Sequence, residues 1–229
     1  DLRGGGPFSG RLTACLVFAG AVCRQILERR GITITANAVR VGQATGKELN
    51  FDMKRAILDA RSAGDSVGSE LECVVTGVPA GVGGLLFGGM ESRIAGMLYA
   101  IPGVKGVEFG RGFALAEMRG SEANDPIRLQ NGRITMASNN AGGINGGITN
   151  GMPIVFRTVL KPTPSIYKQQ HTVDYIGRTD AELQIKGRHD PCIVPRAAVV
   201  QNSLTAFGLL DILTVRYGTL AQKHGFPKV

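Results

Sequence analysis

The chain has 229 residues, which is enough to bury a substantial core in one domain or two. Hydrophobic residues make up 43% of it and charged residues 19%, a balance that excludes a disordered chain and is typical of soluble globular proteins. The net charge is +8, yet the basic residues are scattered and only 6% of residues are aromatic, so the composition favours a small polyanionic ligand such as phosphate over nucleic acid.

Neither a membrane span nor a signal peptide is predicted. The best apolar stretch, residues 16–23, is well short of the ~20 residues that a spanning helix needs. Residues 1–4 contain no initiator Met and no apolar segment, so we expect a cytoplasmic piece of a longer protein. The cysteines have unrelated spacings and no Cys-x-x-Cys pair, which predicts buried free thiols at Cys15, Cys23, Cys73 and Cys192.

The first predicted helix begins near Arg11, is capped by Ser9 and stops at Gly31. Apolar residues at helical spacing predict that it buries a wide face: Leu12, Leu16, Ala19, Val22, Cys23, Ile26 and Leu27. The next predicted elements are a strand over 32–41, a helix over 51–63 capped by Asn50, a strand over 71–78, a helix over 91–99 and a strand over 104–109.

The second half of the chain opens with a polar stretch, residues 118–131, which we expect to be a surface excursion, with a composition that is compatible with disorder. The remaining predicted elements are strands over 133–136, 154–160 and 182–185 and a largely buried helix from about Pro195 to Tyr217. Helices and strands alternate, but no Gly-x-Gly-x-x-Gly opens a helix after a strand, so a Rossmann fold is not indicated.

Three loops carry residue types suited to anions. Residues 139–151 are rich in Gly and Asn, which accept positive φ and let backbone N–H groups approach a ligand. Two prolines stiffen residues 161–165 and hold a lysine and two hydroxyl groups in place. Residues 187–192 place an arginine beside His189 and Asp190, two proton carriers. Each segment is equally compatible with an ordinary solvated loop.

A fourth candidate precedes the first helix. Residues 3–11 read Arg-Gly-Gly-Gly-Pro-Phe-Ser-Gly-Arg and bring two arginines to a helix N-terminus, where free N–H groups and the helix dipole attract anions. A flexible lead-in to a capped helix is the simpler alternative.

Together these segments resemble chorismate synthases. The matching motifs, in the family's order, are Arg-Gly-Gly-Gly at 3–6, Ser-Gly-Arg with Thr-Ala at 9–14, Gly-Asp-Ser-Val-Gly at 64–68, Gly-Val-Lys-Gly-Val-Glu at 103–108, Asn-Ala-Gly-Gly at 140–143, Lys-Pro-Thr-Pro-Ser at 161–165 and Gly-Arg-His-Asp-Pro-Cys at 187–192. The resemblance covers the whole chain but only about the last two-thirds of the family pattern.

The resemblance implies an α+β fold, a β-α-β sandwich incomplete at the N-terminus, in a single domain over 1–229. It also implies a homotetramer and a shikimate-pathway lyase that converts 5-enolpyruvylshikimate 3-phosphate to chorismate and phosphate by 1,4-anti elimination. The cofactor would be reduced FMN, without net redox change. Whether the chain itself also reduces the flavin with NADPH stays open, and no metal, nucleic acid or membrane partner is implied.

The resemblance assigns flavin contacts to Ser9, Gly10, Gly146, Lys161, Pro162, Thr163, Pro164, Ser165 and Arg188. Arg11 and Arg188 would hold the anionic substrate, and Asp190 would serve as the base, working through flavin N5. The chemistry agrees, because loss of phosphate and a proton needs cations at the leaving group and an acceptor for the proton.

Two departures from the family pattern matter. Pro7-Phe8 stands where many members have Arg-Ser, and the family's N-terminal Gly-Glu-Ser-His-Gly and Arg-Pro-x-His-Ala-Asp motifs have no match here. The histidines present, His171, His189 and His224, match neither catalytic histidine of the family. We therefore expect turnover by these residues alone to fall ~10²-fold to 10⁴-fold per missing acid. A flavin- and phosphate-binding chain without turnover is the alternative to an active enzyme, and a basic nucleic-acid binder is a third hypothesis.

Overall fold

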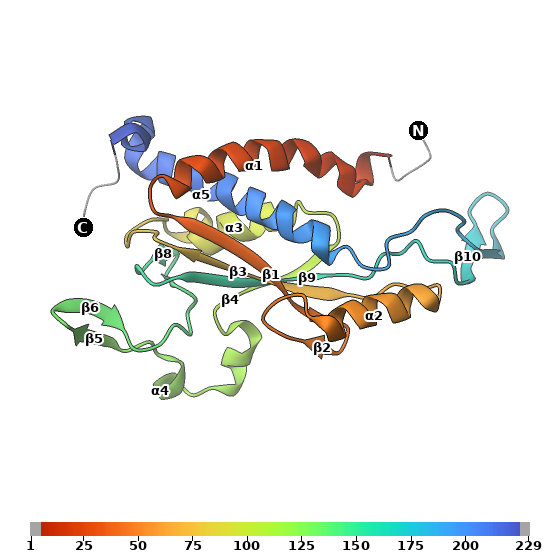
Figure 1. Ribbon diagram of the computed structural model, residues 1–229, viewed down its shortest axis with the longest axis horizontal. Coiled ribbons are helices and arrows are strands. Elements are labelled where there is room, and N and C mark those ends of the chain that lie inside the picture. Colours follow the sequence, from red (N-terminus) through yellow and green to blue (C-terminus); the bar gives the residue numbers. More distant parts are fainter. Residues whose placement is uncertain (1–5, 225–229) are drawn as a thin grey trace.

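The computed structural model describes residues 6–224, which form a five-stranded sheet with helices over one face (Figure 1). Two 3-10 turns, η1 (Gly6–Phe8) and η2 (Gly10–Leu12), lead into the first helix. The arginine and two of the glycines of the motif at 3–6 lie outside the described residues.

The sheet has the order β2-β1-β3-β9-β4, and every neighbouring pair is antiparallel. Its strands are β1 (Thr33–Val41), β2 (Ala44–Thr45), β3 (Ser69–Thr76), β4 (Val104–Phe109) and β9 (Ile154–Leu160). In the centre, Ser69 pairs with Leu160 and Val75 with Ile154. The chain entering β3 therefore meets the chain leaving β9 at one end of the sheet.

The two faces of the sheet differ because side chains alternate along each strand. Residues on one face are buried and form the core with the helices, among them Ile34, Leu71, Cys73, Ile154 and Phe156. The opposite face carries charged residues of the same strands. This pattern is that of an antiparallel sheet with one packed face and one polar face.

The packed face lies beneath α1 (Thr13–Glu28), α3 (Met90–Leu98) and α5 (Val194–His224), while α2 (Phe51–Ser62) lies beside β1 and β2 (Figure 1). Helices α1 and α5 run side by side in the same direction, with Gly20 against Ser203. A Cβ at Gly20 would lie 2.3 Å from the Ser203 carbonyl oxygen, so only glycine permits this close approach. The first turns of both helices consequently lie at the same end of the sheet.

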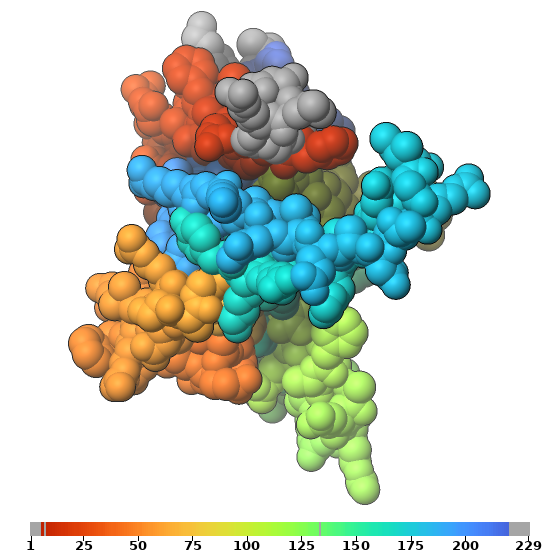
Figure 2. All heavy atoms as spheres, turned by 90° about the vertical axis from the view of Figure 1, so that its right-hand side faces the viewer, coloured from red at the N-terminus to blue at the C-terminus, as the bar shows by residue number. Residues whose placement is uncertain are grey.

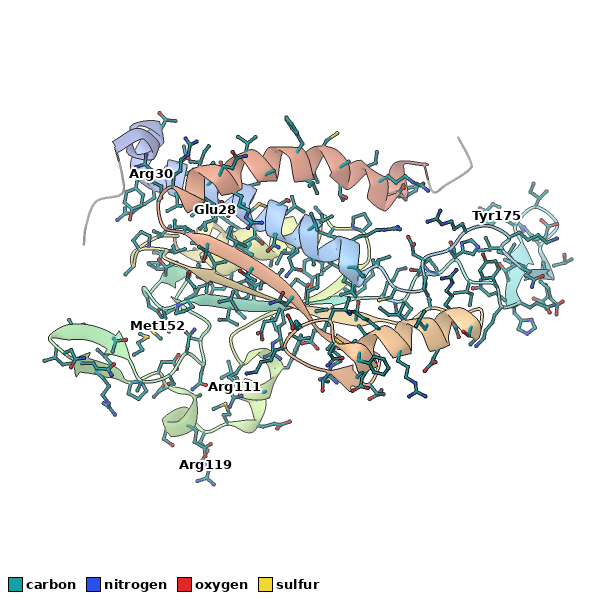
Figure 3. All side chains as sticks on the ribbon, in the orientation of Figure 1. Glu28, Arg30, Arg111, Arg119, Met152 and Tyr175 are labelled. Atoms are coloured by element: carbon teal, nitrogen blue, oxygen red, sulfur yellow. The ribbon has the colours of Figure 1, made fainter. Side chains whose placement is uncertain are left out.

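Smaller elements project from this body. One hairpin joins β5 (Ile127–Gln130) to β6 (Arg133–Met136), another joins β10 (Gln170–Asp174) to β11 (Thr179–Leu183), and a short one joins β7 (Ile144–Asn145) to β8 (Ile148–Thr149). Tyr175 lies at the outer tip of the β10–β11 hairpin (Figure 3). The other short elements are η3 (Leu86–Gly88), η4 (Gly112–Glu117) and α4 (Gly120–Ala123).

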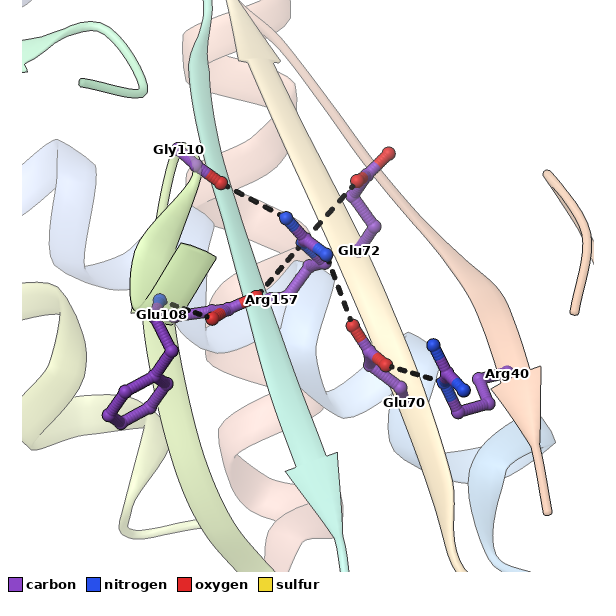
Figure 4. Close-up of polar contacts among 7 residues, drawn as sticks. Arg40, Glu70, Glu72, Glu108, Gly110 and Arg157 are labelled. Atoms are coloured by element: carbon purple, nitrogen blue, oxygen red, sulfur yellow. Dashed lines mark hydrogen bonds and ion pairs between the residues drawn. The ribbon is translucent and has the colours of Figure 1, made fainter. Parts of the chain in front are cut away.

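On the polar face, Arg157 of β9 joins three strands (Figure 4). Its Nε lies 3.2 Å from Glu108 Oε1, its Nη1 lies 3.6 Å from Glu70 Oε1, and Nη2 donates to the Gly110 carbonyl at 3.1 Å. Glu72 lies 3.8 Å from the same guanidinium. One arginine therefore compensates carboxylates from both neighbouring strands, β3 and β4.

Most predicted elements are confirmed. The strands at 104–109, 133–136 and 154–160 have the predicted bounds, and Ser9 and Asn50 cap their helices by accepting the N–H groups of Arg11 and Met53. The mixture of helices and antiparallel sheet confirms the α+β class.

The prediction that the first helix buries a wide apolar face is wrong. In α1 only Thr13, Gly20 and Leu27 are buried, at heptad spacing along the side that contacts α5. Of the residues predicted to be inward, Leu12 is 59% and Val22 48% exposed. Helical periodicity identifies apolar positions, but the described residues supply a packing partner on one side of α1 only.

Residues 118–131 lie at the surface, as expected, but they are ordered. This stretch forms α4 and β5, and β5 pairs with β6 across Asn131-Gly132, both of which have positive φ. An Asn-Gly pair with this geometry makes a tight hairpin turn. The strand expected at 182–185 is β11, shifted toward the N-terminus, and its partner β10 was not predicted, because both strands are exposed and lack an apolar alternation.

Two segments, Gly10–Glu28 and Val194–Thr219, are long and apolar enough to cross a membrane by length and composition, which corrects the expectation that no stretch reaches that length. Much of the second is buried against α1, β1 and β3, as in the core helix of a globular protein. All four cysteines are free, but only Cys73 and Cys192 are buried, whereas Cys23 is half-buried and Cys15 is exposed. Burial raises the pKa of the Cys73 thiol to about 12.

Candidate functional site

The candidate site lies at the end of the sheet where β3 begins and β9 ends. Three loops meet there: residues 64–68 before β3, 161–168 after β9 and 187–191 before α5. The first turns of α1 and α5 lie at this end as well (Figure 1). Viewed end-on, residues 161–190 lie across the molecule between the start of α1 and the region of α2 (Figure 2). We call this region the site end.

The loop at 64–68 holds the other two loops together. Ser66 Oγ donates to the Thr163 carbonyl at 2.6 Å, and the Val67 N–H donates to the Pro191 carbonyl at 2.9 Å. Gly68 lies so close to Pro162 that a Cβ there would be 3.3 Å from its Cδ. These contacts set the spacing between the lysine-containing and arginine-containing loops.

The side chains of two cationic residues at the site end have no hydrogen-bond or ion-pair partner among residues 6–224. They are Lys161 and Arg188, both exposed. The Lys161 backbone N–H is tied to the Gly103 carbonyl at 2.9 Å, so the residue is fixed while its ammonium stays available. Unpaired cations near helix N-termini favour the binding of an anion.

A buried hydroxyl group lies between these cations in sequence. Thr163 Oγ1 is inaccessible to solvent and has no hydrogen-bond partner within the described part of the chain. An unpaired buried hydroxyl is costly, so such a group indicates a missing acceptor or donor. The Lys-Pro-Thr-Pro-Ser loop therefore offers both charge and an unused hydrogen-bonding group to a ligand.

Two acids at the site end are ion-paired. Asp190 accepts a hydrogen bond from Arg196, which lies in the first turn of α5. Lys168 Nζ lies 2.7 Å from Asp65 Oδ2. The hydrogen bond from this ammonium, aided by the Ser66 N–H, lowers the pKa of the Asp65 carboxyl. Both carboxylates are thus held in fixed positions beside the unpaired cations.

Ser9, Gly10 and Arg11 form the turn that leads into α1. Ser9 Oγ accepts the Arg11 N–H at 3.2 Å, so the hydroxyl predicted to contact flavin is in use as a helix cap. Gly10 has open space around its Cα. The turn carries a basic residue to the site end, as the sequence predicts.

Gly146 lies elsewhere in the same chain. It forms the turn between β7 and β8, and Ile148 bridges to Gly83, beyond the far end of β3. Seven residues of β9 separate the two ends of the sheet, which corresponds to roughly 20 Å at ~3.3 Å per residue. Gly146 has positive φ and lines a surface hollow of about 660 Å³ with Gly147, Leu85, Leu86, Gly89, Glu91 and Ser92. The structure does not bring it together with Lys161.

Sequence reasoning missed part of the site end. Ser66 appeared only within a resembling motif, although its hydroxyl holds the Thr163 backbone. Tyr167 and Lys168 follow the predicted loop and were given no role. Their contacts with 64–68 join segments about a hundred residues apart, and no local pattern signals such a pairing.

The arrangement suits a phosphorylated ligand. Lys161 and Arg188 supply positive charge, Thr163 an unused hydroxyl group, and Asp190 a carboxylate anchored by Arg196. Together these four side chains can bind and stabilise a phosphate group and accept a proton near it.

A family model described as chorismate synthase matches residues 1–214 of this chain. The chain belongs to the chorismate synthase family. Chorismate synthases of similar sequence include that of Korarchaeum cryptofilum, 46% identical over 92% of this chain, and that of Thermococcus gammatolerans, 47% identical over 94%. A crystal structure of chorismate synthase covers 92% of this chain with a TM-score of 0.76 and 30% identity.

The chain spans 64% and 66% of the lengths of these two chorismate synthases and 65% of the crystallised one. The structural similarity confirms the α+β fold of the chorismate synthase type that the motifs predicted. The assignments of individual flavin and substrate contacts stay predictions.

Proposed function

We propose that this chain supplies the flavin- and phosphate-binding site of a chorismate synthase, which converts 5-enolpyruvylshikimate 3-phosphate to chorismate and phosphate with reduced FMN. In this reaction the carbon–oxygen bond to phosphate breaks, a ring proton is lost and a second ring double bond forms. The observation that carries the proposal is that the loop with Lys161 and the buried Thr163 hydroxyl and the loop with Arg188 are both bonded to residues 64–68, while both cationic side chains stay unpaired among the described residues.

The residues of the site end fit a phosphorylated cofactor and substrate. Lys161, Thr163, Ser165 and Arg188 would hold flavin phosphate or substrate phosphate, with the N-terminus of α1 at the same end. When bound, reduced FMN supplies an electron-rich partner for the departing phosphate. Asp190, anchored by Arg196, would accept the proton. Ser9 and Gly10 would add flavin contacts, and Arg11 a substrate contact, whereas Gly146 lies at the other end of the sheet and is not part of this site in the chain.

Assembly and location follow from family membership as proposals. We infer a cytoplasmic homotetramer with reduced FMN and a small phosphorylated substrate. A chain that binds flavin without turnover is the second candidate, because His171, His189 and His224 match neither of the family's catalytic histidines.

A flavin titration tests the proposal. We expect FMN to bind the chain at moderate salt and the Kd to rise by ~10-fold or more in Lys161→Ala and in Arg188→Ala, since each loses a charge-assisted hydrogen bond. Arg30→Ala is the matched control, because Arg30 lies at the opposite end of α1 (Figure 3). Unchanged affinity in both site variants would contradict the proposal.

The same titration, with a DNA-binding measurement beside it, distinguishes the proposed function from the nucleic-acid hypothesis. A basic nucleic-acid binder would bind single-stranded or duplex DNA with an affinity that falls steeply with salt. We expect retained FMN affinity and no salt-sensitive DNA binding. The opposite pattern would favour the nucleic-acid reading of the net charge of +8.

A further inference from the structure

The backbone around Arg188 is held by one aromatic residue from another loop. The Tyr167 hydroxyl donates to the Gly187 carbonyl, immediately before Arg188. The Tyr167 ring meets the His189 ring edge-on, with centroids 5.0 Å apart, immediately after Arg188. Tyr167 therefore contacts both chain neighbours of the unpaired arginine.

Tyr167 is itself fixed from two directions. Its N–H donates to the Gly64 carbonyl at 2.9 Å, and its carbonyl accepts Gln184 Nε2 at 2.9 Å. A Cβ at Gly64 would lie 3.2 Å from the Tyr167 Cβ, so the two loops are in close contact. The backbone of Tyr167 is thus held by the same 64–68 loop that positions Thr163.

The Arg188 turn needs such support. Gly187 has a φ of 151°, a conformation in which glycine is favoured and in which the backbone has many alternatives. A ring nitrogen of His189 lies 3.1 Å from the Ile185 carbonyl, which closes the turn on its own side. Arg188 has no partner of its own among the described residues, so its position depends on these flanking contacts.

We propose that Tyr167 is a positioning residue that holds the Gly187–His189 turn so that Arg188 is presented to the anionic ligand before it binds. This inference rests on the proposed function of Arg188. Preorganisation of a cation reduces the entropy cost of binding. Loss of the Tyr167 contacts therefore lowers the affinity for the ligand without removing any ligand contact.

The test uses Tyr167→Phe, which removes the hydroxyl and keeps the ring, and Tyr167→Ala, which removes both. We expect amide hydrogen exchange of the peptide around 185–192 in the unliganded chain to rise about three- to tenfold in Tyr167→Phe, the size of one hydrogen bond, and further in Tyr167→Ala. The Kd for FMN should rise in the same order, while the melting temperature changes little because Tyr167 is exposed.

Tyr175→Phe is the matched control. Tyr175 lies at the hairpin tip, 91% exposed, and should alter neither exchange nor affinity (Figure 3). Unchanged exchange at 185–192 in both Tyr167 variants overturns the inference whatever FMN does. If exchange rises but Arg188→Ala binds FMN as well as the unmodified chain, the positioning contact stands and the proposed function fails. If Arg188→Ala weakens FMN and the Tyr167 variants do not, the function stands and the inference fails.

Discussion

At the scale of single residues, Arg157 offers the sharpest test of stability. Its side chain is only 30% exposed, and its guanidinium lies among Glu70, Glu72 and Glu108. We expect Arg157→Leu to lower the free energy of unfolding by about 2–4 kcal/mol, because Glu72 and Glu108 then lose their counter-charge and Glu70 keeps only Arg40, at 3.1 Å (Figure 4). Urea denaturation followed by circular dichroism measures this.

A second substitution checks the cause. In the Arg157→Leu background, Glu108→Gln should restore part of the lost stability, since it removes one of the repelling charges and keeps the acceptor for the Phe113 N–H. A simple loss of packing would not be relieved by this change. Lack of any rescue would therefore show that charge compensation is not the role of Arg157.

Residue-level prediction from the sequence succeeded where the signal is local. Ser9 and Asn50 are caps because their side chains accept N–H groups two and three residues away, and the sequence alone shows that spacing. Tyr167 and Ser66 could not be found in this way. Their contacts to Gly187 and Thr163 depend on the pairing of β3 with β9, which brings distant loops together.

At the scale of elements, the contact between α1 and α5 can be tested with two glycines. Gly20→Ala places a methyl group 2.3 Å from the Ser203 carbonyl oxygen, which forces the helices apart. We expect a loss of roughly 1–3 kcal/mol of stability despite the better helix propensity of alanine. Gly96→Ala is the matched control in α3, because a Cβ there meets nothing within 4 Å.

The control has an expected sign of its own. Gly96→Ala should stabilise the protein by about 0.5–1 kcal/mol through helix propensity alone. Thermal melting of both variants against the unmodified chain measures the difference. If Gly20→Ala also stabilises, the two helices are not in close contact at this position.

The β5–β6 hairpin gives a pH prediction. Burial works to raise the pKa of Asp125, but hydrogen bonds from Ser138 Oγ and from the N–H groups of Ala141 and Asn140 outweigh it and hold the pKa below the ordinary 3.8. A lowered folded-state pKa means that the stabilisation is present above pH 3.8 and lost as the pH falls through the folded-state value.

We therefore expect amide protection of residues 127–136 to be constant from pH 7 to about pH 5 and to fall below pH ~4, after correction for intrinsic exchange. Asp125→Asn should lower protection at neutral pH and remove the pH dependence. Asp180→Asn, on the other projecting hairpin, is the control. Equal pH dependence in the Asp125 and Asp180 variants would contradict this role for Asp125.

Elements were predicted well where burial imposes a period. The alternation in β9 and β3 and the apolar spacing in α3 each follow from packing on a single core. The hairpins projecting from the body have no such burial, so β10 was missed and β5 was expected only as part of a surface excursion. The Asn131-Gly132 turn was the available signal for the β5–β6 hairpin.

At the scale of the whole molecule, the structure shows which of the predicted loops meet. The loops that carry Lys161 and Arg188 both bond to residues 64–68, because antiparallel pairing brings the end of β9 beside the start of β3. Gly146 belongs to the same predicted pocket but lies at the other end of the sheet. Sequence motifs indicate which residues bind a family's ligand. The distances between those residues depend on the lengths and directions of the strands, which the motifs do not contain.

The outer face of α1 gives the last prediction. Phe18 is 76% exposed and lies one turn before Val22 on α1, and the exposed Leu12 lies in the turn that leads into this helix, so an apolar surface extends along the outside of the helical layer. Contiguous exposed apolar surface binds apolar probes and promotes association. We expect the 229-residue chain to bind the dye ANS and to self-associate at high concentration.

A double variant, Phe18→Gln with Val22→Gln, tests this surface. It should bind several-fold less dye with an unchanged melting temperature, because neither side chain is part of the core. Ile176→Gln, which removes a side chain that is 94% exposed at the tip of the β10–β11 hairpin, is the control. If both variants reduce dye binding equally, or neither does, the dye-binding surface is not α1.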